Sequence, residues 1–254
     1  MRLAARLAIL ALTGPFLLGA AKPKLVPDVS QNRIEIRYSF TGAELLLFGA
    51  ILYPGGRVPT ERADIAVVVK GPMERLVIRE KQKVAGIWMN VESARFRSAP
   101  SFYAVASSRP LPSLVEERTA AIYELGLQNL QLSPGSGLAP DVQRRFEAGL
   151  IDLKQRRRLY YEDTTGVQIT DGVLYRARIR IPALVPVGNY TAETFLIKDR
   201  RILAGAVRDI RVEKLGFERF VATAADRWSL AYGLVAVALS LFLGWAASAV
   251  FRRG

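Results

Sequence analysis

The sequence predicts a mainly β protein: an immunoglobulin-like β-sandwich with a helical insertion, followed by one C-terminal transmembrane helix. Short runs of alternating or β-branched residues recur between turn residues, which is the spacing of a sandwich. Apolar residues at helical spacing interrupt these runs near 110–163. An uncharged apolar stretch at 228–251 is long enough to cross a bilayer. Two small β domains joined by helices are the alternative arrangement.

Residues 1–21 have the order of a secretory signal peptide. Two arginines precede an apolar run at 7–18, and the small residues Gly19 and Ala21 mark a cleavage site. The run is short for a span of about 30 Å of hydrocarbon, and an uncleaved N-terminal anchor is the alternative. We therefore expect residues 22–227 to form a domain exported to the periplasm of a bacterium.

Strand signals dominate the chain before the helical segment. Charged and apolar residues alternate at 33–38, which predicts a half-buried strand. The run Leu45 to Phe48 predicts burial on both faces, and Ile65 to Val69 is β-branched. The predicted strands of this block are 33–38, 43–52, 65–69, 75–79, 84–89 and 101–106.

Two helices are predicted in the insertion. The first covers 113–127, with Ser113 as the N-cap of a capping box. The second runs over 140–161, with apolar residues on one side at helical spacing. A basic run at 154–158 could contact lipid headgroups, but we favour exposed charge that stabilises the helix end.

Strand signals return after the insertion, at 175–181, 190–197 and 202–212. Arg176, Arg178 and Arg180 alternate with apolar residues, so their side chains should share one strand face. Such a face could hold an oxyanion or carboxylate, because arginine matches planar anions bidentately. The alternative, which we favour, is a solvated face balanced by cross-strand partners such as Glu193.

The apolar stretch at 228–251 predicts a transmembrane helix. Residues 230–251 number 22, which at about 1.5 Å each spans roughly 33 Å. The arginines in the tail at 252–254 indicate a cytoplasmic C-terminus. Small residues recur every fourth position and could pack against a second copy or a permease; they are Ala236, Ser240, Gly244 and Ser248. A passive anchor is the alternative.

Composition excludes several chemistries. The 254 residues contain no Cys and no His, which excludes Ser-His-Asp hydrolysis, histidine-ligated metals and covalently attached haem. We therefore expect no cofactor. The net charge is +13, of which +9 belongs to residues 22–227, because these hold 32 of the basic and all 23 acidic residues. This charge favours anionic lipid or acidic partners, and export argues against nucleic acid.

Several segments together point to a known family. They are FTGAELLLFGA at 40–50, AGIWMN at 85–90, FYAVASSRPL at 102–111, PVGNY at 186–190, LGFERF at 215–220 and the C-terminal segment at 232–253. With them the chain resembles a family of alphaproteobacterial putative transmembrane proteins. The resemblance implies a signal peptide, an exported domain and a C-terminal span. It carries over no activity and no catalytic residues, and it implies an association with permeases similar to sulfite exporters.

These observations predict a single-pass inner-membrane protein with its β domain in the periplasm and its C-terminus in the cytoplasm. The expected function is a non-enzymatic accessory or binding module that acts with a membrane partner such as a transporter. A cofactor-free enzyme using carboxylate and Arg/Lys chemistry is one alternative. A structural envelope protein held by lipid or cell wall is another.

Overall fold

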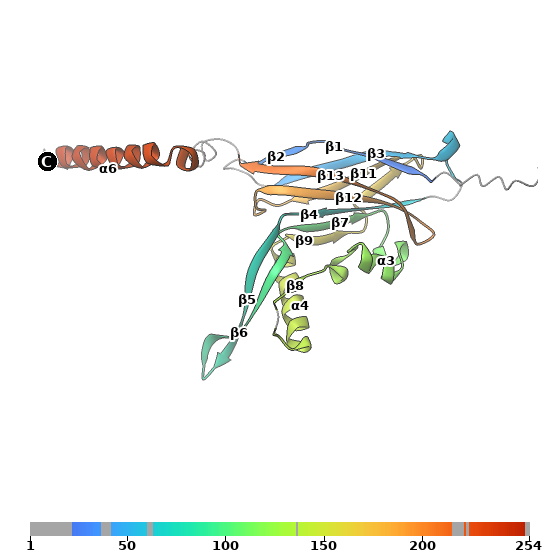
Figure 1. Ribbon diagram of the computed structural model, residues 1–254, viewed down its shortest axis with the longest axis horizontal. Helices are drawn as coiled ribbons and strands as arrows, with labels where there is room; N and C mark the ends of the chain where they lie inside the picture. Colours follow the sequence, from blue (N-terminus) through green and yellow to red (C-terminus); the bar gives the residue numbers. More distant parts are fainter. Residues whose placement is uncertain are drawn as a thin grey trace, which may run out of the picture.

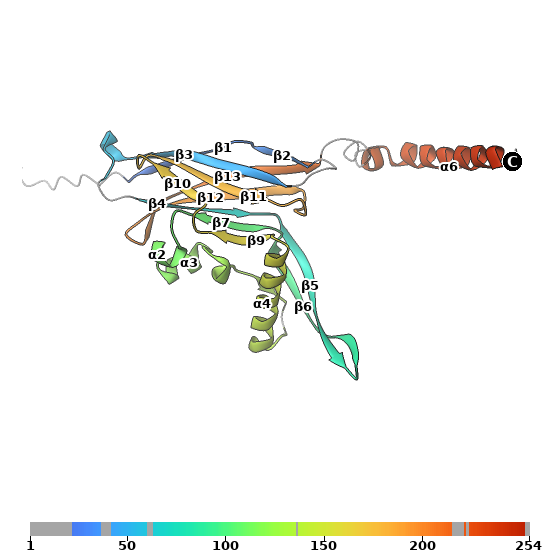
Figure 2. The same ribbon diagram turned by 180° about the vertical axis from the view of Figure 1, so that it is seen from behind.

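The computed structural model describes residues 22–36, 42–59, 63–135, 137–214, 221 and 224–251. Two β-sheets face each other, a long hairpin projects from one side, and a helix extends from one end (Figures 1 and 2). The mainly β class with a C-terminal apolar helix is therefore confirmed. The predicted signal peptide and the tail at 252–254 lie outside the described residues.

The first sheet is antiparallel and has the strand order β1-β3-β11-β10. Its strands are β1 Lys24–Val29, β3 Ala43–Leu52, β10 Val167–Thr170 and β11 Leu174–Ile181. β1 was not predicted, since it contains Pro27. It lies at the sheet edge, where a missing backbone donor is tolerated.

The second sheet has the strand order β2-β13-β12-β4-β7-β9. Its strands are β2 Arg33–Ile36, β4 Asp64–Lys70, β7 Tyr103–Ser107, β9 Tyr160–Asp163, β12 Gly188–Lys198 and β13 Arg201–Lys214. The two edge pairs, β2 with β13 and β7 with β9, are parallel. Arg37 and Tyr38 of the predicted strand at 33–38 lie outside the described residues.

Strands from before and after the helical segment alternate within both sheets. β3 pairs with β11, placing Leu47 opposite Ala177, and β4 pairs with β12, placing Val67 opposite Thr194. The two strand blocks therefore share one hydrophobic core rather than forming two separate β domains.

The centre of this core is β4. Its residues Ile65 to Val69 have no exposed surface, because the other sheet covers one face and the helical insertion the other (Figure 1). The prediction that Leu45 to Phe48 is buried on both faces was wrong. Leu45 and Leu47 are buried, whereas Leu46 is half-buried and Phe48 exposed, because β3 lies in the outer sheet and has one solvent-facing side.

A long hairpin replaces the short strands predicted at 75–79 and 84–89. β5 (Met73–Val84) pairs with β6 (Ile87–Pro100), and the two-residue strand β8 (Ser133–Pro134) joins the base of this third sheet. No strand was predicted for the polar stretch between these two segments. It is extended because the distal hairpin is exposed on both faces and needs no apolar alternation.

The predicted helix at 113–127 is broken. It consists of α2 (Leu111–Leu114), α3 (Glu117–Ile122) and the 3-10 turn η2 (Leu127–Asn129). Val115 is extended and buried between the two helices. Ser113 lies inside α2, where its hydroxyl donates to the Pro110 carbonyl at 2.7 Å, so it is not an N-cap.

The second predicted helix forms but ends earlier than expected. α4 covers Pro140–Arg156. Arg158 then adopts a left-handed conformation (φ 56°), and the N–H of Leu159 donates to the Lys154 carbonyl at 2.9 Å. The chain is thereby redirected into β9, so the predicted continuation to Tyr161 was wrong.

The predicted C-terminal helix is confirmed as α6 (Ser229–Phe251). Residues 229–248 have a mean hydropathy of 2.0, and none of the most apolar stretch is buried against the rest of the chain. By length and composition α6 can cross a membrane, and it extends away from the β domain (Figure 2).

Candidate functional site

The three predicted arginines lie on the exposed side of β11. Tyr175, Ala177, Ile179 and Ile181 alternate with them and are buried in the sandwich. The shared face predicted from the alternation is therefore present, although only part of it belongs to a concave surface.

Arg178 and Arg180 line a groove of about 650 Å³, and Arg176 does not. The start of β3, the end of β9, the C-terminal end of α4 and the segment after β11 form its walls. Arg158, at the left-handed turn after α4, brings a third guanidinium to this groove. Its other lining residues are Gly42, Ala43, Glu44, Gln155, Tyr161, Glu162, Asp163, Ile181, Pro182 and Ala183.

Tyr161 attaches β9 to β11 beneath the arginines. Its hydroxyl donates to the Arg180 carbonyl at 3.0 Å and accepts from the Arg180 N–H at 2.7 Å. Burial raises the pKa of the Tyr161 phenol well above its ordinary value. The hydroxyl therefore remains neutral and holds the backbone of Arg180, while the Arg180 side chain is left for another partner.

The carboxylates that line the groove are already engaged. Glu162 accepts a short hydrogen bond from the N–H of Leu127. Asp163 accepts bonds from the N–H and the hydroxyl of Thr165, at 3.0 and 3.1 Å. Glu44 lies 3.9 Å from Arg178, and both side chains are more than half exposed, so their attraction is weak.

The groove lining holds three arginines and three carboxylates, but not every arginine is paired. Among the described residues, neither Arg158 nor Arg180 makes an ion pair with a carboxylate. Their guanidiniums can donate planar pairs of hydrogen bonds to a carboxylate or an oxyanion. The described residues contain no group of His, Cys, Asp and Glu suited to a metal ion.

Glu193 is not the partner of this arginine face. It lies on β12 in the other sheet, where its carboxylate is 3.6 Å from the ammonium of Lys70. The prediction failed because β11 and β12 are consecutive in sequence but belong to different sheets.

The basic run at 154–158 is divided by the structure. Lys154 is buried, its ammonium bonds Glu74 of β5, and it lies 5.7 Å from the ring centroid of Tyr160. Arg156 pairs with Asp152 along α4. Arg158 is the basic residue of this run that lines the groove. Sequence reasoning missed it because the left-handed turn carries no glycine signal.

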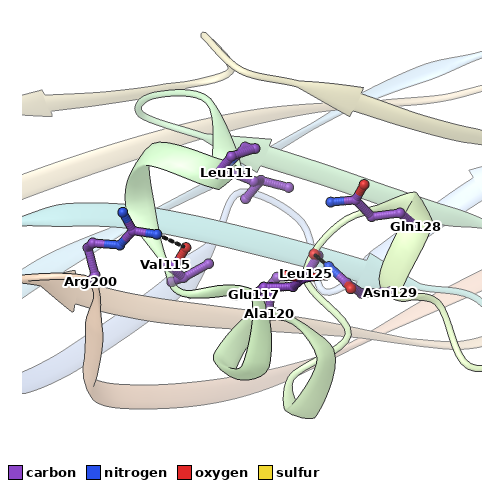
Figure 3. Close-up of a pocket in the computed structure, with 9 residues that line it drawn as sticks. Leu111, Val115, Glu117, Ala120, Leu125, Gln128, Asn129 and Arg200 are labelled. Atoms are coloured by element: carbon purple, nitrogen blue, oxygen red, sulfur yellow. Dashed lines mark hydrogen bonds between the residues drawn. The ribbon is translucent and has the colours of Figure 1, made fainter.

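A second, smaller cavity lies under the helical insertion and is structural. It measures about 250 Å³ and is lined by Leu111, Pro112, Val115, Glu117, Ala120, Leu125, Gln128, Asn129 and Arg200 (Figure 3). The Arg200 guanidinium donates to the Val115 carbonyl at 3.4 Å, and the Asn129 amide donates to the Leu125 carbonyl at 2.7 Å. The Arg200 bond connects the insertion to the sandwich, whereas the Asn129 bond lies within the insertion.

The predicted small-residue stripe lies on α6. Ala236, Ser240, Gly244 and Ser248 are exposed. The Ser240 hydroxyl donates to the Ala236 carbonyl at 2.8 Å, so it is satisfied within its own helix. A Cβ added at Gly244 would contact nothing within 4 Å. The packing role of this stripe stays a prediction.

Comparison with known proteins places the chain in a family. No significant match to a curated protein is found. Residues 24–253 match the family described as "Putative transmembrane protein (Alph_Pro_TM)". This match covers nearly all of the chain, including the whole β domain and α6. The chain belongs to this family of transmembrane proteins.

Proposed function

We propose that this protein is a non-enzymatic, membrane-anchored binding module that presents an anionic ligand to a membrane partner such as a transporter. In this proposal an immunoglobulin-like β domain lies in the periplasm, and α6 holds it in the inner membrane. The observation that carries the proposal is the pair of guanidiniums without carboxylate partners, Arg158 and Arg180, in the groove of about 650 Å³.

The backbone of Arg158 supports a binding role. A left-handed conformation costs a non-glycine residue roughly 1–2 kcal/mol, and glycine usually occupies this position after a helix. An arginine there has a conformational cost without any ion pair among the described residues to offset it. A ligand anion would supply the missing interaction, which is a common reason for strain at functional sites.

The environment of the acidic groups favours binding over catalysis. General acid–base chemistry requires a carboxyl group or phenol free to exchange a proton with a substrate. Here Glu162 and Asp163 accept main-chain hydrogen bonds, and the Tyr161 hydroxyl is engaged on both sides by Arg180. These groups shape the groove, while the arginines are available to contact a ligand.

Arg158→Gly tests the groove directly. We expect sulfate, phosphate or succinate to bind the full chain in detergent, and this variant to weaken binding at least tenfold, because charge-assisted hydrogen bonds contribute about 1.5–3 kcal/mol each. Its stability should be unchanged or higher by up to about 1 kcal/mol, because glycine relieves the left-handed conformation. Calorimetric titration at constant ionic strength and thermal melts measure the two effects.

Two glutamine variants provide the matched comparison. Arg180→Gln should weaken binding like Arg158→Gly, whereas Arg176→Gln should not, because Arg176 shares the strand face but lies outside the groove. Equal effects of Arg176→Gln and Arg180→Gln would mean that the anion is attracted by the overall positive charge of the strand face and not by the groove. Absence of binding of all three anions to the parent chain would refute the proposed ligand class.

The membrane orientation is tested separately by fusions. Alkaline phosphatase needs disulfides, which form in the periplasm and not in the cytoplasm. Fusion after Phe220 should therefore be active, and fusion after Gly254 inactive, because the arginines that follow α6 favour the cytoplasmic side. The reverse pattern would overturn the periplasmic placement. Copurification of a permease with the tagged full chain from the same membranes would identify the proposed partner.

A further inference from the structure

The outer half of the β5–β6 hairpin exposes a cluster of apolar side chains. Ile87 and Trp88 are each 68% exposed, Met89 is 51% exposed and Val84 is 46% exposed. Exposed apolar side chains are common singly, but a contiguous group at the end of a projecting element marks an interaction surface. We call the segment from Lys81 to Val91 the hairpin tip.

The hairpin tip is held away from the sandwich by a supported stem. Phe146 and Leu150 of α4 pack with Phe96 and neighbouring residues of the stem in a separate hydrophobic cluster. The Arg145 guanidinium binds Glu80 at 3.2 Å and makes a shorter ion pair with Glu92, one on each strand. α4 thus stabilises the hairpin up to the level of Glu80, and the tip extends beyond it (Figure 1).

The turn at the end of the tip is tight. Val84 pairs with Ile87, and the two residues between them, Ala85 and Gly86, both have positive φ values of 49° and 87°. Two positive φ angles at these positions are typical of a type I′ turn, which matches the twist of a two-residue hairpin. The tip is therefore narrow, and its apolar residues lie immediately beside the turn.

The tip also carries positive charge. Lys83 lies opposite Trp88 in the strand register, and Lys81 lies opposite Asn90. Neither lysine pairs with a carboxylate among the described residues, and the nearby acidic residues of the stem, Glu80 and Glu92, both pair with Arg145. Tryptophan with aliphatic residues and lysines is the composition of segments that lie at a membrane–water interface.

The hairpin leans toward the end of the sandwich from which α6 departs (Figures 1 and 2). In both views its tip reaches about the same level along the axis of α6 as the first turn of that helix. A bilayer crossed by α6 would therefore have its surface near the tip. The bilayer that α6 would cross is accordingly the nearest apolar and anionic surface to the tip.

We propose that the hairpin tip inserts into the surface of the bilayer that α6 spans, with Ile87, Trp88 and Met89 among the headgroups and upper acyl chains. Lys81 and Lys83 contact the phosphates of anionic lipids there. The hairpin is then a second attachment point, which restricts how the β domain tilts above the membrane. This inference does not depend on the anion-binding groove.

Quenching of Trp88 by brominated lipid tests the insertion. The chain has three tryptophans, so the variant Trp228→Phe/Trp245→Phe leaves Trp88 alone to report. The full chain is placed in nanodiscs of phosphatidylcholine and phosphatidylglycerol, with or without bromine at acyl carbons 6 and 7. We expect at least twofold quenching of the Trp88 emission and a blue shift relative to the protein in detergent.

A tryptophan at the far end of the sandwich is the matched control. Val58 is 46% exposed and follows the 3-10 turn η1 (Pro54–Gly56), which lies at the end opposite to α6 (Figure 1). Val58→Trp, in a background with all three native tryptophans changed to Phe, should show no quenching. Lys81→Gln/Lys83→Gln should reduce quenching of Trp88 in anionic discs and leave it unchanged in neutral discs.

Three outcomes would overturn the proposal. The first is a Trp88 emission that brominated lipid leaves unchanged. The second is equal quenching at positions 58 and 88, which would mean that the domain lies on the disc without orientation. The third is loss of a copurifying protein on Ile87→Asp while Trp88 remains unquenched, which would assign the tip to a protein partner. Unchanged melting of the tip variants would show that folding is not the cause.

Discussion

Val67→Asp should unfold the β domain or lower its free energy of unfolding by on the order of 3–5 kcal/mol, the effect of an uncompensated buried charge. Val67 has no exposed surface and lies in the central strand β4, opposite Ala106 of β7 and Thr194 of β12. This side of the sheet faces the four-stranded sheet, since a Cβ at Gly166, before β10, would lie 2.9 Å from that of Ala106. Total stability is typically 5–15 kcal/mol, so the loss is severe.

The effect of Val67→Asp should also depend on pH. Burial favours the neutral carboxylic acid and raises the pKa of the new aspartate in the folded domain. Between the unfolded and folded pKa values the folded domain binds more protons, so raising the pH favours unfolding. The variant should therefore melt at a lower temperature at pH 8 than at pH 4.5, relative to the parent chain at each pH.

Circular dichroism melts of the full chain in detergent measure both effects. Val77→Asp is the matched control, because Val77 is also a strand valine but is 52% exposed on β5. That change should alter stability by no more than about 0.5 kcal/mol, as is usual at the surface. Equal melting of the two variants would contradict the assignment of β4 as the centre of the core.

Gly49→Ala should be the second most damaging change, although it adds one methyl group. A Cβ at Gly49 would lie 2.7 Å from the Tyr175 hydroxyl oxygen and 2.9 Å from the Pro27 Cα, and closer still to the Val26 carbonyl oxygen. β1 pairs with β3 here, with Pro27 opposite Gly49, and two of these obstacles are backbone atoms that cannot rotate away. Overpacking of this kind costs about 1–3 kcal/mol, and we expect the upper end of that range.

Gly205→Ala provides the comparison within another strand. The added Cβ would lie 3.5 Å from the Phe195 ring, an ordinary van der Waals contact. This variant should be neutral or slightly stabilising, since alanine lowers the entropy of the unfolded chain. Thermal melts of the two full-length variants measure this difference in stability. Equal stability would mean that β1 does not approach β3 as closely as described.

The arginine groove shows which features of a site can be predicted from the residue pattern of one strand. The alternation along β11 is a property of consecutive residues, since buried and exposed side chains must alternate on a strand, and it correctly placed Arg176, Arg178 and Arg180 on one face. It could not separate Arg176 from the other two. That difference arises from β9 and from the end of α4, which lie beside the distal half of β11 only.

The errors made at Glu193 and Arg158 have the same cause. Glu193 was assigned to the neighbour of β11 because consecutive strands often pair, but the chain crosses between sheets after Ile181 and pairs β12 with β4. Arg158 resembled the end of an exposed helix face. Its left-handed turn ends α4 and directs the chain into β9, where the ring of Tyr160 lies 5.7 Å from the ammonium of Lys154.

The sequence by itself determined the mainly β class, most of the strands in the sandwich, α4 and the apolar helix α6, because periodicity and uninterrupted hydropathy are local properties. The tertiary structure alone decided which strands pair, where the helical insertion breaks, and that a polar stretch becomes the outer part of a long hairpin. These features depend on contacts between residues distant in the chain, such as Arg145 with Glu80 and Glu92. The groove is a product of such contacts, since its lining comes from several segments. The hairpin tip is one segment, but α4 supports the stem that carries it.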